Sequence, residues 1–281
     1  MTLKHLLYAV TATFIWGFSF VAVKYAQHQF PLIFLVGFRF LAIGLLMIPF
    51  VPRPQKHEWK PVAIVAITFG FLNYTLLYIG LKGVSASTGA LVHQISVPLI
   101  AFGGYFMLKE KITKWIVLGV TIALLGVFII MGKPSGNDRF LYILILLASA
   151  CFSALGNIFT KKYGPFNPSM LNGWTSIMAA PLLLLASFTL EDGQIQSLQH
   201  ADLMGWICVI FTILCSGILA FTLWYSLLNQ YPVSKLAPLS LLSPFFAVVS
   251  SVIVLGEQLT PQLIIGGLCT IAGVAIVQIR K

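Results

Sequence analysis

The chain has 281 residues, of which 59% are hydrophobic and only 9% are charged, and its formal net charge is +10. Soluble domains carry charge on about a quarter of their residues, so this chain has too little polar surface to cover a water-facing globule. Its solvent must be lipid, in which only helices or closed barrels satisfy the hydrogen bonds of the backbone.

The apolar stretches are continuous and not alternating, and each is about long enough to cross a bilayer as a helix. They predict an all-α integral membrane protein with ten transmembrane helices. The predicted spans are 6–25, 31–51, 61–81, 88–108, 115–132, 140–160, 168–190, 204–228, 236–255 and 261–279. The longest predicted loop, 191–203, is too short for a separate soluble domain. We expect the first stretch to be a membrane span and not a cleaved signal peptide, because its apolar run is too long.

Basic residues gather on one side of these spans. With a cytoplasmic N-terminus, the inside segments hold twelve Lys and Arg residues and the outside segments hold four. The inside residues are Lys4, Arg53, Lys56, Lys60, Lys109, Lys111, Lys114, Lys161, Lys162, Lys235, Arg280 and Lys281, and the outside residues are Lys24, Lys82, Lys133 and Arg139. This asymmetry predicts that both termini are cytoplasmic. Because the basic residues orient the protein in the membrane, its positive net charge does not indicate a nucleic-acid partner, and we expect none.

Two segments of the chain repeat each other at one constant offset, residues 109–129 and 256–276. The matched pairs are Glu110 and Glu257, Thr113 and Thr260, Gly119 and Gly266, and Gly126 and Gly273. Each half, 1–137 and 138–281, then holds five spans, and an odd number turns the second half upside down. Such inverted repeats are typical of secondary transporters, which expose a site between the halves alternately to the two sides. The glycines share one face of their helices, which predicts close helix packing.

Several kinds of chemistry are missing from the sequence. It contains no G-x-x-x-x-G-K-[ST] loop, no H-E-x-x-H motif and no Asp or Glu well inside a predicted span. We therefore expect no catalytic residue, no metal and no cofactor, and transport driven by gradients. A membrane enzyme or a sensor is the rival class.

Four local motifs are distinctive. They are Phe14-Ile15-Trp16-Gly17-Phe18-Ser19-Phe20-Val21, Gly37-Phe38-Arg39-Phe40, Gly156-Asn157-Ile158-Phe159-Thr160-Lys161-Lys162 and Ala237-Pro238-Leu239-Ser240-Leu241-Leu242-Ser243-Pro244. Together they resemble the EamA family of the drug/metabolite transporter superfamily. The resemblance implies ten helices in two inverted five-helix halves, a bacterial inner membrane location, and export of small metabolites of the cysteine and O-acetylserine type. Export of drugs, nucleotide precursors or sugar-related solutes is the alternative within the superfamily.

Few polar residues lie inside the predicted spans, and these are the candidates for a substrate site. Arg39 would hold a substrate carboxylate, or else bond backbone carbonyls at a broken helix. His93 would couple protons to transport, or else form a neutral hydrogen bond between helices. Gln94 offers an amide beside it, close to Pro98. Asn157 would bind substrate or join neighbouring helices.

Aromatic residues complete the predicted site. Trp16, Tyr78 and Trp224 are expected as walls over the apolar part of a solute, although Trp16 and Trp224 could instead face lipid. The predicted cavity lies between spans 1–4 and 6–9, with spans 5 and 10 outside it. Without a buried carboxylate, it would favour neutral or anionic amino-acid-like solutes. Nothing in the sequence indicates an oligomeric state.

Overall fold

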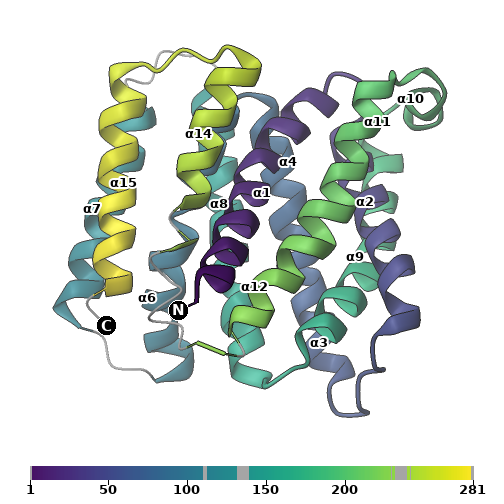
Figure 1. The fold of residues 1–281 in the computed structure, drawn as a ribbon, viewed down its shortest axis with the longest axis horizontal. Helices are drawn as coiled ribbons and strands as arrows, with labels where there is room; N and C mark the ends of the chain where they lie inside the picture. The colour runs from purple at the N-terminus through teal and green to yellow at the C-terminus, as the bar shows by residue number, and fades with distance from the viewer. Residues whose placement is uncertain are drawn as a thin grey trace.

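The computed structural model describes residues 2–109, 113–131, 139–228, 230–231, 239–240 and 242–279, and within these ranges every regular element is a helix (Figure 1). Seven helical stretches of the described chain are long and apolar enough to span a membrane. They are Leu3–Ala26, Leu32–Phe50, Trp59–Lys82, Ala86–Leu108, Phe140–Tyr163, Pro168–Leu190 and Leu203–Trp224. Shorter apolar helices cover Lys114–Ile130, Leu242–Leu255 and Pro261–Ile276. The chain is therefore an all-helical, multi-pass membrane protein.

The helices run up and down between two faces of the bundle. α1 (Leu3–Ala26) begins near the face that carries the short helix α3 (Trp59–Val65) and ends near the face that carries α10 (Gln194–His200) (Figure 1). We call these the α3 face and the α10 face. α2 (Leu32–Met47) returns from the α10 face and ends in a 3₁₀ turn, Ile48–Phe50, where Pro49 cannot continue the helix.

Two of the spanning stretches pass through a π-helical segment. α3 continues through a π-helical segment, Ala66–Asn73, into α4 (Tyr74–Lys82). In the second half, α11 (Leu203–Ile210) continues through another π-helical segment, Phe211–Leu219, into α12 (Ala220–Leu228). Rare π-helical turns of this kind occur often at functional sites.

The fourth predicted span is broken into α5 (Ala86–His93) and α6 (Ser96–Leu108). Gln94 and Ile95 form the turn between them. Pro98 explains the break, because its ring displaces the carbonyl four residues earlier, which is that of Gln94.

The remaining helices follow the predicted spans closely. They are α7 (Lys114–Met131), α8 (Arg139–Tyr163), α9 (Pro168–Leu190), α14 (Leu242–Leu255) and α15 (Pro261–Ile279). Residues 236–238 and 241 of the predicted ninth span lie outside the described residues.

The prediction of a loop over 191–203 is wrong in part, because this segment contains α10. Gly193 turns the chain at a φ of 83°, and the Gln194 side chain then donates to the carbonyl of Ser187 (2.9 Å) and to that of Glu191 (2.7 Å). The free carbonyls at the end of α9 are thereby capped, and the next residues can start a new helix.

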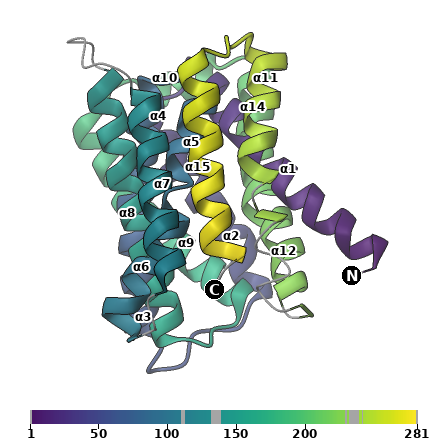
Figure 2. The same ribbon diagram turned by 90° about the vertical axis from the view of Figure 1, so that its left-hand side faces the viewer.

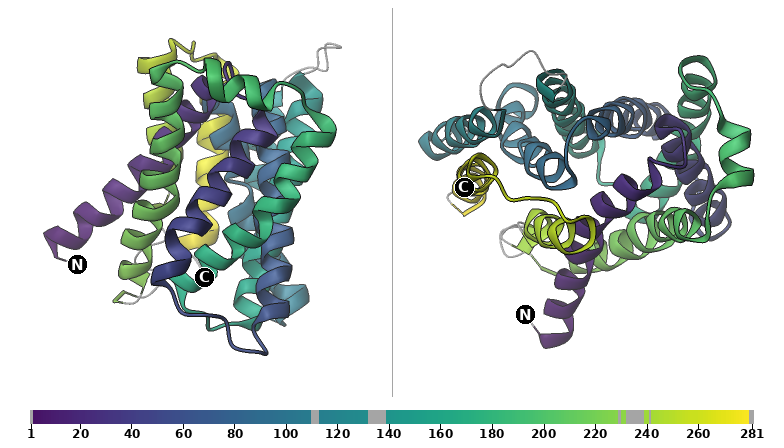
Figure 3. Two further views of the ribbon diagram at one scale, coloured as in Figure 1. Left: turned by 90° about the vertical axis from the view of Figure 1, so that its right-hand side faces the viewer. Right: turned by 90° about the horizontal axis from the view of Figure 1, so that it is seen from above.

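Two helix pairs form opposite ends of the bundle. α7 packs along α15 at one end and α2 packs along α9 at the other (Figures 1 and 2). The predicted packing role of the glycines is confirmed: a Cβ built on Gly266 would lie 2.6 Å from the carbonyl oxygen of Gly126, and one on Gly273 would lie 2.5 Å from that of Gly119. The view from above shows the other helices arranged between the two pairs (Figure 3).

Candidate functional site

A cavity of about 440 Å³ lies in the interior of the bundle. All seven residues selected from the sequence line it: Trp16, Arg39, Tyr78, His93, Gln94, Asn157 and Trp224. They come from α1, α2, α4, the α5–α6 segment, α8 and α12. Among its described lining residues none belongs to α7, α9 or α15. Spans 5 and 10 therefore lie outside the cavity as predicted, and the seventh span also contributes no wall.

Arg39 is the only charged residue on the described walls of this cavity, and its side chain is 5% exposed. Its Nη1 donates to the Tyr78 hydroxyl (3.2 Å) and its Nη2 to the Ser216 hydroxyl (3.4 Å). The guanidinium carbon lies 5.6 Å from the centre of the Tyr74 ring. Both bonds go to hydroxyls, so the alternative prediction of backbone carbonyl partners is not supported by the described residues.

The environment of Arg39 leaves binding capacity unused. Its Nε is buried without a hydrogen-bond partner in the described part of the chain, and the partners of Nη1 and Nη2 are neutral. A buried charge without a counterion is costly, commonly by several kcal/mol, so the site is stabilised when an anion enters. A carboxylate suits the planar fork of the guanidinium, which can bind it with two parallel hydrogen bonds. The geometry is that of an anion-binding site, because no carboxylate on the described walls pairs with Arg39.

His93 is the last residue of α5, and its side chain contacts the end of the π-helical segment Ala66–Asn73. Its Nε2 lies 3.1 Å from Oδ1 of Asn73, which also accepts a hydrogen bond from the Ser149 hydroxyl (2.9 Å). Since an amide oxygen only accepts, His93 donates through Nε2, and its other ring nitrogen is then the acceptor in a neutral ring. This bond between helices matches the structural alternative stated for His93. Its role in proton coupling stays a prediction.

The two selected amides differ in their surroundings. Asn157 donates from Nδ2 to the carbonyl of Ser153 in its own helix (2.8 Å) and makes no hydrogen bond to another helix among the described residues. Gln94 lies in the turn between α5 and α6, where the helix is interrupted beside the cavity. Neither residue therefore joins two described helices through its side chain, and both line the cavity.

Aromatic rings form one wall. Trp16 of α1 packs against Trp224 of α12, with ring centroids 5.5 Å apart, and against Phe221 at 5.3 Å. Both tryptophans line the cavity, so the alternative that they face only lipid is wrong. The Trp16 Nε1 is buried and has no partner in the described structure, which leaves a second unused donor.

Sequence reasoning missed several polar members of the cavity, among them Ser153 and Ser216. Ser153 was recognisable, because it precedes Asn157 by four residues and so shares its helix face. Ser216 gave no such signal, since a π-helical segment shifts the phase of the residues that follow.

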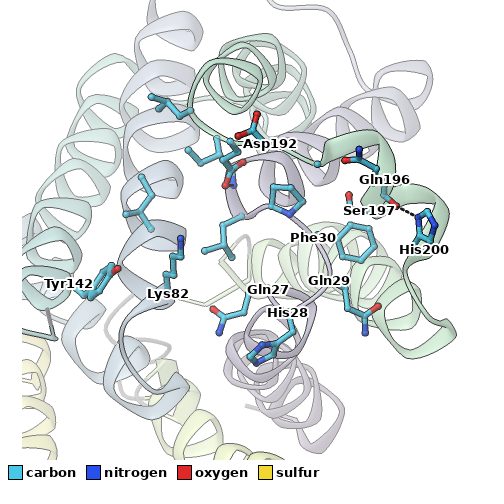
Figure 4. A pocket seen from close by; sticks show the side chains of 17 residues that line it. Gln27, His28, Gln29, Phe30, Lys82, Tyr142, Asp192, Gln196, Ser197 and His200 are labelled. Atoms are coloured by element: carbon cyan, nitrogen blue, oxygen red, sulfur yellow. Dashed lines mark hydrogen bonds between the residues drawn. The ribbon is translucent and has the colours of Figure 1, made fainter.

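A second, larger hollow of about 960 Å³ lies on the α10 face (Figure 4). It is lined by the connection from α1 to α2, including Gln27 and His28, by Lys82 and Tyr142, and by the segment around α10. It shares no lining residue with the central cavity and holds none of the residues selected from the sequence. Its size reflects open loops at the surface, so the central cavity is the better candidate for a substrate site.

Comparisons with known proteins fit this architecture. The EamA-like transporter family matches residues 3–132 and again residues 140–279, so the chain belongs to this family. A protein of Salmonella typhimurium named as a probable amino-acid metabolite efflux pump is 30% identical, over 95% of this chain and 92% of its own length. A Chlamydia trachomatis transporter of S-adenosylmethionine and S-adenosylhomocysteine is 24% identical, over 89% of this chain and 82% of its own.

A solved crystal structure shares the fold, with a TM-score of 0.68 over 98% of this chain and 96% of the other, at 17% sequence identity. The family and the named relatives are transporters, which places this chain among membrane transporters and gives no support for an enzyme.

Proposed function

We propose that this protein is a secondary active exporter of small amino-acid-like metabolites, of the cysteine and O-acetylserine type. The observation that carries the proposal is the central cavity, in which a buried guanidinium without a counterion faces amides, hydroxyls and an aromatic wall. A zwitterion would place its carboxylate on Arg39, its ammonium on the amide oxygens of Gln94 and Asn157, and its apolar part against Trp16 and Trp224.

The proposed architecture is ten spans in two inverted five-helix halves, 1–137 and 138–281. The double match of the family model supports it, because the two matched ranges coincide with these halves. The π-helical segments support it as well, since they interrupt the third predicted span and the eighth, which are counterparts in the two halves. A cavity between such halves is exposed alternately to the two sides.

The proposed orientation places both termini in the cytoplasm of a bacterium and the α10 face outside its inner membrane. The charge asymmetry supports it. A reporter that is active only outside the cytoplasm should be silent when fused after Lys281 and active when inserted near Asp192. The reverse pair of signals would contradict the orientation.

Among alternative substrates, the structure disfavours cations. No described lining residue of the cavity is an Asp or a Glu, and the charge of Arg39 repels a positive solute. Sulfonium compounds such as S-adenosylmethionine, and cationic drugs, therefore fit this cavity less well than neutral or anionic amino acids.

Counterflow in proteoliposomes tests the proposal. Purified protein in vesicles loaded with unlabelled O-acetylserine or cysteine should accumulate the labelled compound from outside without ATP. Lysine and a cationic drug serve as matched competitors, and they should compete weakly. Chemical conversion of the solute would indicate an enzyme instead, and preferred exchange of the cations would refute the proposed substrate class.

A further inference from the structure

Glu257 joins two helices at the α10 face. It follows α14, and its carboxylate accepts hydrogen bonds from the backbone N–H of Ala86 (2.6 Å) and of Ser87 (3.2 Å) at the start of α5. The Ser87 hydroxyl donates to the same carboxylate (2.5 Å) and also contacts the hydroxyl of Ser251 in α14. A negative charge on free backbone N–H groups at a helix N-terminus is a favourable contact. Here the charge comes from the segment that follows α14, so it holds α5 against the end of α14.

Glu191 makes a chemically equivalent contact elsewhere on this face. It follows α9, and its carboxylate accepts from the backbone N–H of Ile33 and of Phe34, both at 2.9 Å, and from the Ser187 hydroxyl (2.9 Å). α2 and α9 pack along each other, and among their described residues only Arg39 lines the central cavity. Glu191 therefore stabilises a helix pair that contributes only one described residue to the cavity wall.

The helices joined by Glu257 are cavity walls. Ala90 and His93 of α5 line the cavity, and so do Ser243 and Pro244 of α14. The capped N-terminus of α5 lies one turn before Ala90, directly beyond the cavity on the side of the α10 face. The contact therefore lies where the cavity would have to open in order to communicate with that face.

A third charged contact closes the same place. The Nζ of Lys24 in α1 donates to the carbonyl of Leu81 near the end of α4 (2.8 Å), and Leu81 itself lines the cavity. Lys24 and Glu257 thus fix the ends of α4 and α5, which flank the short turn at residues 83–85. Charged side chains therefore add hydrogen bonds to the apolar packing of Leu81 and Val84 at these ends.

We propose that the contact of Glu257 with Ala86 and Ser87 is the closing contact of the outer gate. Its separation lets α14 and α5 part and opens the cavity to the α10 face, and the structure is the state in which that gate is shut. This inference rests on the proposed function, in which the α10 face is outside. The carboxylate is half-buried at the surface, so water replaces its partners on opening. Gly256, at a φ of 64°, makes the turn between α14 and Glu257.

A reversible cross-link tests whether the two helices must part. In a chain whose cysteines at 151, 208, 215 and 269 are replaced by alanine, Ser87→Cys and Ser251→Cys place two thiols in contact across the gate. A mild oxidant should join them and stop export, and a reductant should restore it. Either single variant is the control, and its export rate should be the same with and without oxidant. Export at the parental rate by protein shown to be fully cross-linked would overturn the proposal.

A labelling experiment separates a gate from a structural cap. Ser96→Cys in the same cysteine-free chain reports access to the cavity, and a membrane-impermeant maleimide is added outside intact cells. Glu257→Gln weakens the closing contact and should raise the labelling rate several-fold. Glu191→Gln, the matched control, should leave the rate unchanged at equal protein level. Equal rates in the two variants would show that Glu257 only caps a helix.

The labelling needs no substrate. A chain that fails to exchange amino acids in vesicles would refute the proposed function, and the labelling rates would still decide the gate.

Discussion

The α7–α15 pair and the walls of the central cavity both consist of apolar helices, but these pack in opposite ways. Between α7 and α15 the glycines bring one backbone onto the other, so a Cβ on Gly126 would lie 2.6 Å from the carbonyl oxygen of Gly266. Around the cavity the helices stay apart, and the buried side chains include an arginine, hydroxyls and amides. The comparison suggests a division of labour, in which one region is a rigid frame and the other a binding site. Substitutions in the frame should then lower the amount of folded protein, whereas substitutions in the cavity should lower export.

The largest effect on folding is expected in the frame. Gly266→Val introduces side-chain atoms where a Cβ alone would lie 2.6 Å from a carbonyl oxygen and 2.7 Å from a side-chain carbon of Ile130. Overpacking of this kind costs about 1–3 kcal/mol or more, so the amount of folded protein recovered from membranes should fall strongly. Ile265→Val, on the exposed side of the same helix, is the control and should be harmless. Normal yield and export from Gly266→Val would show that this pair is not a rigid frame.

In the cavity, a substitution should lower export without lowering the yield of folded protein. Arg39→Lys keeps the charge but replaces a planar fork by a point charge, and we expect export to fall at least about tenfold, the equivalent of roughly 1.4 kcal/mol, with normal protein yield. The matched control is Arg53→Lys at an exposed position between α2 and α3. Export and yield falling together would assign Arg39 to the frame, and full export would remove it from the site.

His93 tests whether the cavity also couples transport to protons. We expect His93→Ala to abolish flux driven by a pH gradient and to spare exchange of solute, because exchange needs no net proton movement. His28→Ala, at an exposed site on the α10 face, should change neither. If pH-driven flux in the His93 variant equals that of the parent, the bond to Asn73 is the whole of its role.

Hydropathy predicted much of the helix layout because membrane insertion depends on it directly, whereas the orientation expected from charge stays a prediction. The ends of α9 and α15 coincide with the predicted spans. The cavity residues were predictable because an ionisable or amide group inside a span is costly and therefore rare. The helix α10 escaped prediction, since its capping by Gln194 depends on a contact with the preceding helix.

The partners of the polar residues were equally hidden in the sequence. The hydroxyls of Tyr78 and Ser216 meet at Arg39 from different helices. Hydropathy indicates that a residue is inside the membrane and not which way it faces, and the π-helical segment that carries Ser216 alters the helical phase. Contacts between helices distant in the sequence thus set the details of the site.

The smallest effect is expected at Asn157. It gives the most direct comparison of the cavity with the packed helices, because Asn172 of α9 is the same residue type in a packing position. Asn157 faces the cavity and bonds only its own helix within the described structure, whereas Asn172 of α9 donates to the carbonyl of Gly217 in η3, the π-helical segment Phe211–Leu219 (3.0 Å). Asn157→Ala should therefore raise the substrate concentration that gives half-maximal counterflow by a few-fold. It should leave thermal stability unchanged. Asn172→Ala should lower stability, since it leaves a buried carbonyl without its donor, and leave half-saturation unchanged. Counterflow at graded substrate concentrations and a thermal melt in detergent measure both quantities, and an exchange of the two outcomes would place Asn157 in the frame.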